Sequence, residues 1–206
     1  EEFGAWRAIR DDLTLALSVP GEELEQAELA EAYLLLADSA ARIGDYSTTG
    51  PALVRALPHA QAGANQDMIR EIHTQLARHL LLTGSGRQSL EHLRAALRCA
   101  DRDGNSEARI GLLKLCGSVH LQAGRLTKAQ QNFEKALGLA LALDDRRRAA
   151  SCRAGLGGVL MYRGRLRDAE VQLLMAAEEA RDCKDQIGLT SRLLNVALVQ
   201  NLRGEV

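Results

Sequence analysis

Six glycines of this chain share one spacing of 40 residues. They are Gly4, Gly44, Gly84, Gly124, Gly164 and Gly204. Glycine ends a helix at little cost because it accepts a positive φ. A fixed period of this length is typical of chains in which one small structural unit stacks on the next. The sequence therefore predicts a repeat protein with a turn at each of these glycines.

Residues at fixed distances from the glycines are alternately small and large. Before the glycine, small residues recur at Ala37, Ala77, Gly117, Gly157 and Ala197. After it, larger residues recur at Leu53, Leu93, Phe133 and Leu173, and small ones at Ala56, Ala96, Ala136 and Ala176. Small residues let two helices approach closely, and the larger apolar residues fill the space around that contact. Each unit is predicted to be a helix, a short turn and a second helix.

This pattern predicts an all-α chain of about ten helices, because no segment alternates as a strand would. The helices are expected near 5–19, 26–43, 51–63, 66–83, 86–101, 106–123, 127–143, 146–163, 167–183 and 186–203. Pro51 suits the first turn of its helix, whereas Pro58 should kink it. The chain is expected to form one solenoid: a half repeat at 1–25, repeats at 26–65, 66–105, 106–145 and 146–185, and a half repeat at 186–206. We expect this array to be a fragment of a longer protein.

The repeat resembles the tetratricopeptide repeat, in a variant of about 40 residues as found in Pins-type adaptors and bacterial signalling regulators. The first helices carry the resemblance at Leu36/Ala37, Leu76/Ala77, Cys116/Gly117, Leu156/Gly157 and Val196/Ala197, and the second helices at Ala129/Phe133/Ala136 and Ala169/Leu173/Ala176. The family's early tryptophan is replaced by Tyr33, His73, Leu113, Arg153 and Leu193, and the closing proline is absent. These departures fit a longer loop between repeats. The resemblance implies a right-handed α-solenoid.

Composition argues against several functions. A net charge of −1 does not favour nucleic acid, which requires a basic surface. No apolar run reaches the ~18–20 residues of a membrane span. Cys99, Cys116, Cys152 and Cys183 are far apart, as expected for reduced thiols in the cytoplasm. No histidine or cysteine spacing suits a metal, and no catalytic group can be assembled, so we expect no cofactor and no enzyme activity.

The first helices are the predicted binding surface, because in the resembled family they line a concave groove. Candidate groove residues are Leu34, Asp38, Gln75, Arg78, Lys114, Ser118, Gly158, Met161, Asn195 and Leu198. Arg78 and Lys114 lie on consecutive repeats and could contact one acidic side chain. Gly155 and Gly158 are expected on the inner face, where close helix packing is the simpler explanation and a bare patch for a ligand backbone the alternative.

A second candidate surface is the basic edge, defined by Arg125, Arg163, Arg165 and Arg167 at the turns within repeats. Acidic residues prevail at the turns between repeats, and Arg146, Arg147 and Arg148 break that rule. A basic edge could bind an acidic protein or be merely solvated, and the third alternative is contact with nucleic acid or an anionic membrane.

The preferred hypothesis is a non-catalytic scaffold or adaptor that binds a peptide or helix of a partner protein in its groove. One alternative is a sensor domain of a bacterial transcription regulator or kinase that binds a small ligand or peptide. Another is a structural unit that associates end to end through its terminal helices, where apolar side chains would otherwise meet solvent.

Overall fold

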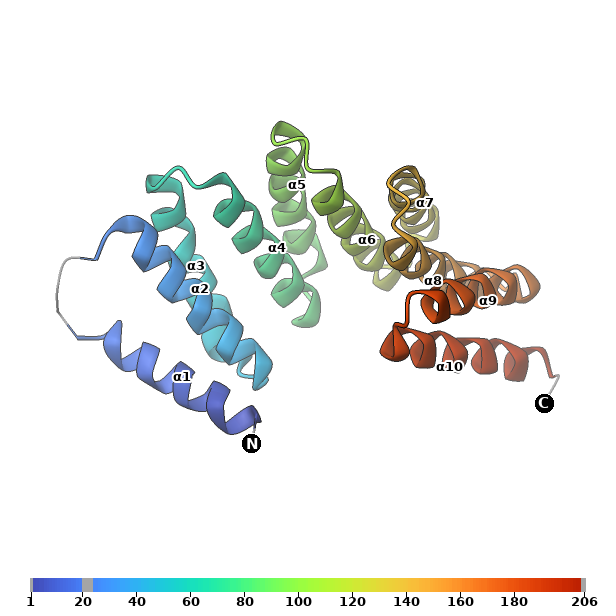
Figure 1. Ribbon diagram of the computed structural model, residues 1–206, viewed down its shortest axis with the longest axis horizontal. Helices are drawn as coiled ribbons and strands as arrows, with labels where there is room; N and C mark the ends of the chain where they lie inside the picture. Colours follow the sequence, from blue (N-terminus) through green and yellow to red (C-terminus); the bar gives the residue numbers. More distant parts are fainter. Residues whose placement is uncertain (1, 20–23, 205–206) are drawn as a thin grey trace. The chain divides into compact units, whose positions relative to one another are not determined.

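The computed structural model describes residues 2–19 and 24–204, which fold into ten α-helices without a strand among them. The helices are α1 (Glu2–Ala16), α2 (Gln26–Arg42), α3 (Tyr46–Ala62), α4 (Gln66–Leu82), α5 (Gly86–Arg102), α6 (Ser106–Gln122), α7 (Leu126–Ala142), α8 (Arg146–Tyr162), α9 (Leu166–Asp182) and α10 (Gln186–Arg203). Within each of the two units described below, successive helices run in alternating directions (Figure 1). The predicted fold class, an all-α solenoid of helical hairpins, is confirmed.

Three-residue turns join the helices from α2 to α10, both within and between repeats. Within repeats, the middle residue is one of the periodic glycines, and Gly44 has a φ of 76°. Between repeats, the same position has a positive φ in Ala64, Gly104, Asp144 and Lys184. The predicted longer loop between repeats is therefore wrong. Helices of 17 residues, separated by three, account for the period instead.

Helix α3 begins at Tyr46, five residues before its predicted start. The cause is a cap on the first turn, where the Asp45 carboxylate accepts hydrogen bonds from the Thr48 amide, the Thr48 hydroxyl and the Ser47 hydroxyl. Such a cap satisfies amides that have no partner within the helix. Pro51 thus lies inside α3 rather than in its first turn, together with Pro58. Helix α1 ends at Ala16, earlier than predicted, and Gly4 lies within it rather than in a turn.

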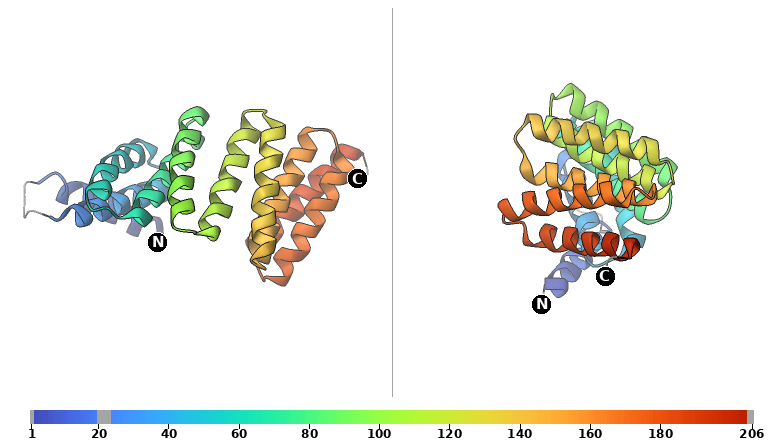
Figure 2. Two further views of the ribbon diagram at one scale, coloured as in Figure 1. Left: turned by 90° about the horizontal axis from the view of Figure 1, so that it is seen from above. Right: turned by 90° about the vertical axis from the view of Figure 1, so that its right-hand side faces the viewer.

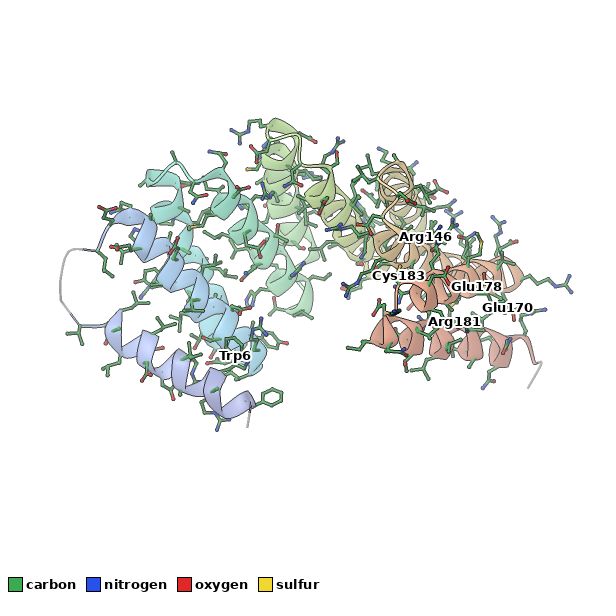
Figure 3. The ribbon with its side chains drawn as sticks, in the orientation of Figure 1. Trp6, Arg146, Glu170, Glu178, Arg181 and Cys183 are labelled. Carbon is green, nitrogen blue, oxygen red and sulfur yellow. The ribbon has the colours of Figure 1, made fainter. Side chains whose placement is uncertain are left out.

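The chain divides into two compact units, the first ending at Asp103 and the second beginning at Gly104. In the first unit, α2 packs against α3 and α4 against α5, and α1 lies against α2. Its core is built around Leu53 and Ile72, which are fully buried. Trp6, labelled on α1 in Figure 3, lies beneath the Arg42 guanidinium of α2, 4.3 Å from carbon to ring centre.

In the second unit, α6 packs against α7, α8 against α9, and α9 against α10 (Figure 2). The first helices of these hairpins also contact one another, α6 with α8 and α8 with α10. They form one layer, and α7 and α9 form the other. Helix α8 therefore has neighbours in both layers, and side chains from α6, α8 and α10 share one face of this unit.

The Phe133 ring shows how closely this unit is packed. It lies between α6 and α8, where a Cβ built on Gly117 would be 2.8 Å from Cζ, and one built on Gly155 would be 2.6 Å from Cδ1. The prediction that Gly155 faces the groove is therefore wrong, because its face of α8 is covered by this ring. The space beside Gly157 is occupied in the same way by Leu173. Close helix packing explains both glycines, whereas at Gly158 a Cβ would meet only Leu121, at 3.6 Å.

Candidate functional site

All the candidate groove residues lie on first helices of hairpins. Leu34 and Asp38 are on α2, Gln75 and Arg78 on α4, Lys114 and Ser118 on α6, Gly158 and Met161 on α8, and Asn195 and Leu198 on α10. Several of their polar groups bond within their own helix. Asp38 accepts from Arg42 at 2.7 Å, and the Gln75 amide donates to Glu71 at 3.0 Å. Arg78 belongs to the first unit and Lys114 to the second, and their shared acidic ligand stays a prediction.

A pocket of about 410 Å³ opens on the α6–α8–α10 layer of the second unit. Its lining comes from all three helices and from the N-terminal caps of α8 and α10: Lys114, Asp145, Arg147, Arg148, Ser151, Asp185 and Arg192. We call this set the basic pocket, since four cations face two carboxylates. Lys114 is the one predicted groove residue in the lining.

Two aspartates at the pocket are held by the helices that begin there. Asp145 accepts from the Arg148 amide at 2.8 Å, and Asp185 accepts from the Gly188 amide at 2.9 Å. Burial opposes charge on Asp145, but the Arg148 amide and guanidinium outweigh it and lower its pKa. Both carboxylates are therefore fixed as helix caps, and their place in the pocket is explained by local structure.

Arg148 is the most fully paired cation of the pocket. Its guanidinium bonds the Asp145 carboxylate and reaches Glu107 of α6 at 2.9 Å. The hydrogen bond to Asp145 raises the pKa of Arg148. Lys114 donates to the Ser151 hydroxyl, which ties α6 to α8 across the pocket. These bonds fix the first two helices of the layer relative to each other.

Arg192 differs from the other cations because it is buried, with 7% of its surface exposed. Its Nε has no hydrogen-bond partner among the described residues. The closest carboxylate oxygen, Asp185 Oδ2, lies 3.7 Å from Nη1, beyond hydrogen-bond distance. Gly188 makes room for this side chain, since a Cβ there would overlap Nη1. A buried guanidinium with an unused donor is costly, and an anion in the pocket would supply what it lacks.

The residues of the basic edge are all exposed and surround the turns 123–125 and 163–165. Arg163 donates to Thr127 at 3.2 Å, and Arg165 pairs with Asp168 at 2.7 Å. Exposed pairs of this kind contribute little to stability. One cavity of about 370 Å³ reaches this edge, because Arg165 and Asp168 line it together with residues of α7, α8 and α9.

Most of the basic pocket was not predicted from the sequence. Arg147 and Arg148 were noticed only as exceptions to the charge pattern, and Arg192 was missed. A signal for Arg192 existed in the repeat register. The equivalent positions of the other repeats hold the apolar residues Ala32, Ile72, Leu112 and Cys152. An arginine at a core position of a repeat is the mark of a site that serves something besides packing.

No described helix meets the requirements of a membrane span, and the described residues hold no group of three or more potential metal ligands. The fold is that of an all-helical repeat protein built from hairpins. No family model and no curated protein matches the chain.

Solved structures with the same fold do match. BtubC (BKLC) from P. vanneervenii superposes with a TM-score of 0.75 at 19% identity, covering 98% of this chain and 83% of that protein. A signal transduction ATPase with a tetratricopeptide repeat sensor, from Pyrococcus horikoshii, gives 0.77 at 14% identity over 86% of this chain. This chain spans only 28% of that protein. A Rap protein complexed with competence and sporulation factor gives 0.57 at 15% identity, over 85% of this chain and 53% of that one. The TM-scores establish a tetratricopeptide-like repeat fold, and at these identities the likeness extends to the fold alone.

Proposed function

We propose that this chain is a non-catalytic interaction module that binds a segment of a partner protein on the first-helix face of its second unit. The observation that carries the proposal is the basic pocket. Side chains from three successive first helices, α6, α8 and α10, converge on one cavity, and a ligand there would contact all three. A rigid layer of helices with a few polar groups at its centre suits an extended peptide or a helix.

Two further observations support this assignment. Apolar side chains also lie exposed elsewhere on α10, the helix that carries Arg192, with Leu194 67% and Leu198 48% exposed. They would give a bound segment apolar contacts in addition to the charged ones. The Rap protein of the same fold binds another factor in its solved complex. The site is thus a mixed apolar and basic surface, which favours an acidic, amphipathic partner segment.

A selection with displayed peptides tests this function. Phage-displayed 12-residue peptides would be selected on the whole chain, and the winners labelled and measured by fluorescence anisotropy. We expect binding to be lost in Lys114→Glu and retained in the Arg163→Glu/Arg165→Glu variant of the basic edge. Circular dichroism checks that each variant is folded. Peptides that bind both variants equally, or an empty selection, would count against peptide binding on the first-helix face.

A sensor function is the second candidate, favoured by the likeness to the tetratricopeptide sensor of the ATPase. It would use the same pocket for a small ligand in place of a peptide. A metabolite that raises the melting temperature of the wild type, while the selection yields no peptide, would favour this function. Location in the cytoplasm and end-to-end association stay predictions.

A further inference from the structure

We infer that the basic pocket is a carboxylate-binding site, in which Arg192 receives an acidic side chain of the bound segment. This inference rests on the proposed function and names the chemistry of its partner. The first step is the burial of Arg192, whose Nε–H has no acceptor among the described residues. A guanidinium offers several donors in a planar fork that matches the two oxygens of a carboxylate.

The second step is that the residues around this guanidinium differ from those at the equivalent positions of the other repeats. Arg192 occupies a register position where Ile72, Leu112 and Cys152 are buried in the core. The position four residues earlier is Gly188, where other repeats have side chains such as Met68. Any Cβ at that position would overlap Arg192 Nη1 and Asp185 Oδ2. The arginine and the glycine therefore depend on each other, and neither improves packing by itself.

The third step is the charge of the surroundings. Four cations line the pocket against Asp145 and Asp185, and Glu107 pairs with Arg148 from just outside. The lining thus carries more positive than negative charge, which favours an anionic ligand. The planar guanidinium of Arg192 matches the two oxygens of a carboxylate.

Contacts of the remaining cations indicate where the carboxylate would lie. Arg148 is bonded to Asp145, and Arg147, largely exposed, is 4.0 Å from Asp185. Lys114 is tied to Ser151. Arg192 is the buried cation with an unused donor and, in the part of the chain that the structure describes, no carboxylate within hydrogen-bond distance. The carboxylate would therefore bond its guanidinium, in the cavity that Ser151 and Lys114 also line.

Nuclear magnetic resonance of the arginine Nε–H groups tests the inference on the whole chain. The probe is the tripeptide acetyl-Ala-Glu-Ala-amide, and its control has glutamine in place of glutamate. The Arg192 signal is the cross-peak that disappears in Arg192→Leu. We expect the glutamate peptide to shift that signal and saturate it, with the glutamine peptide at least about tenfold weaker, the factor for losing a charge-assisted hydrogen bond.

Two variants complete the design. Arg192→Leu restores the residue type of Leu112, so it should fold with an equal or higher melting temperature while losing the glutamate peptide. Arg146→Leu is the matched control, because Arg146, at the start of α8 in Figure 3, is exposed and does not line the pocket. It should bind like the wild type.

Several results would overturn the inference. They are an Arg192 signal unmoved by the glutamate peptide, equal shifts with both peptides, or a stronger response to inorganic phosphate than to the glutamate peptide. These points are read from wild-type spectra, and if Arg192→Leu failed to fold, Arg192→Lys would supply the assignment of the Arg192 signal. If selected peptides bind without involving Arg192, the inference fails and the proposed function stands. If the glutamate peptide binds at Arg192 but no displayed peptide is selected, the inference stands and the proposed function fails.

Discussion

Substituting Gly155 by alanine tests the tightest packing in the second unit. A Cβ at this position would lie 2.6 Å from Cδ1 and 2.8 Å from Cζ of Phe133. The ring cannot move away easily, since it is 3% exposed and Gly117 contacts its other side. Alanine gains about 1 kcal/mol over glycine in a helix interior. Overpacking costs about 1–3 kcal/mol, and a ring held on both sides places the cost at the upper end.

We therefore expect Gly155→Ala to lose about 2 kcal/mol of unfolding free energy, a drop of about 4–8 °C in melting temperature for a chain of this size. The assay is urea unfolding followed by circular dichroism. Gly111→Ala is the matched control, because a Cβ there would meet nothing within 4 Å. It should gain about 1 kcal/mol.

Phe133→Leu should rescue the Gly155→Ala variant, because other repeats carry Leu53 and Leu173 at this position. Where the second helix has leucine, the following first helix has a larger residue in place of Gly155: Gln75 follows Leu53, and Asn195 follows Leu173. The two changes should couple by about 1 kcal/mol or more in a double-mutant cycle. If Gly155→Ala stabilised the protein as much as Gly111→Ala, the ring would not be confined and the reasoning would be wrong.

Three further predictions concern pH, backbone strain and thiol reactivity. Burial and the neighbouring His92 lower the pKa of His73 to about 4 in the folded chain, against about 6.5 in the unfolded chain. Between these two pH values the unfolded chain therefore binds more protons than the folded chain. Stability should be full above about pH 6.5 and fall by about 1–2 kcal/mol toward pH 4, after a discount for partial exposure. The fall should be smaller in His73→Gln, where burial still lowers the pKa of His92; an unchanged slope in that variant would exclude His73 as the cause. Ala64→Gly should raise the unfolding free energy by about 1 kcal/mol, because Ala64 has a φ of 51° that glycine adopts without strain; a loss in urea unfolding would contradict this. Of the four cysteines, only Cys183 is exposed. A thiol reagent such as Ellman's should therefore react quickly with one thiol in the native chain and with four after denaturation. A second thiol that reacts quickly in the native chain would show that the core opens.

The turns show what the sequence could and could not predict about the fold. Glycine at Gly124 and Gly164 marks turns within repeats because no other residue adopts positive φ so readily. The turns between repeats have the same geometry at Ala64, Asp144 and Lys184. Those residues do not mark a turn by themselves. The repeat period still predicted the ends of the second helices within one residue, at 63, 101, 143 and 183, against Ala62, Arg102, Ala142 and Asp182 in the structure.

The start of α3 was mispredicted for a different reason. Proline at the first turn of a helix is a good general expectation, but Asp45 caps the chain five residues before Pro51. Thr49, next in the first turn, is 4% exposed and takes the place that Ala129 and Ala169 occupy in later repeats. Side-chain capping and burial together outweigh the missing amide of one proline. Only contacts between residues, and not a single residue's preference, fix this boundary.

Repeat architecture explains why a site could be placed at Arg192 without disturbing the rest of the chain. Each repeat contacts only its neighbours, so the cost of burying a guanidinium stays within the packing of α8, α9 and α10. A core arginine without a ligand should lower stability locally, and leucine at this position should raise it. Binding should change in the opposite direction, because the donor is lost with the charge. If Arg192 only filled space, its substitution would change stability and ligand affinity in the same direction. A functional origin of Arg192 requires that leucine raise the stability and lower the affinity.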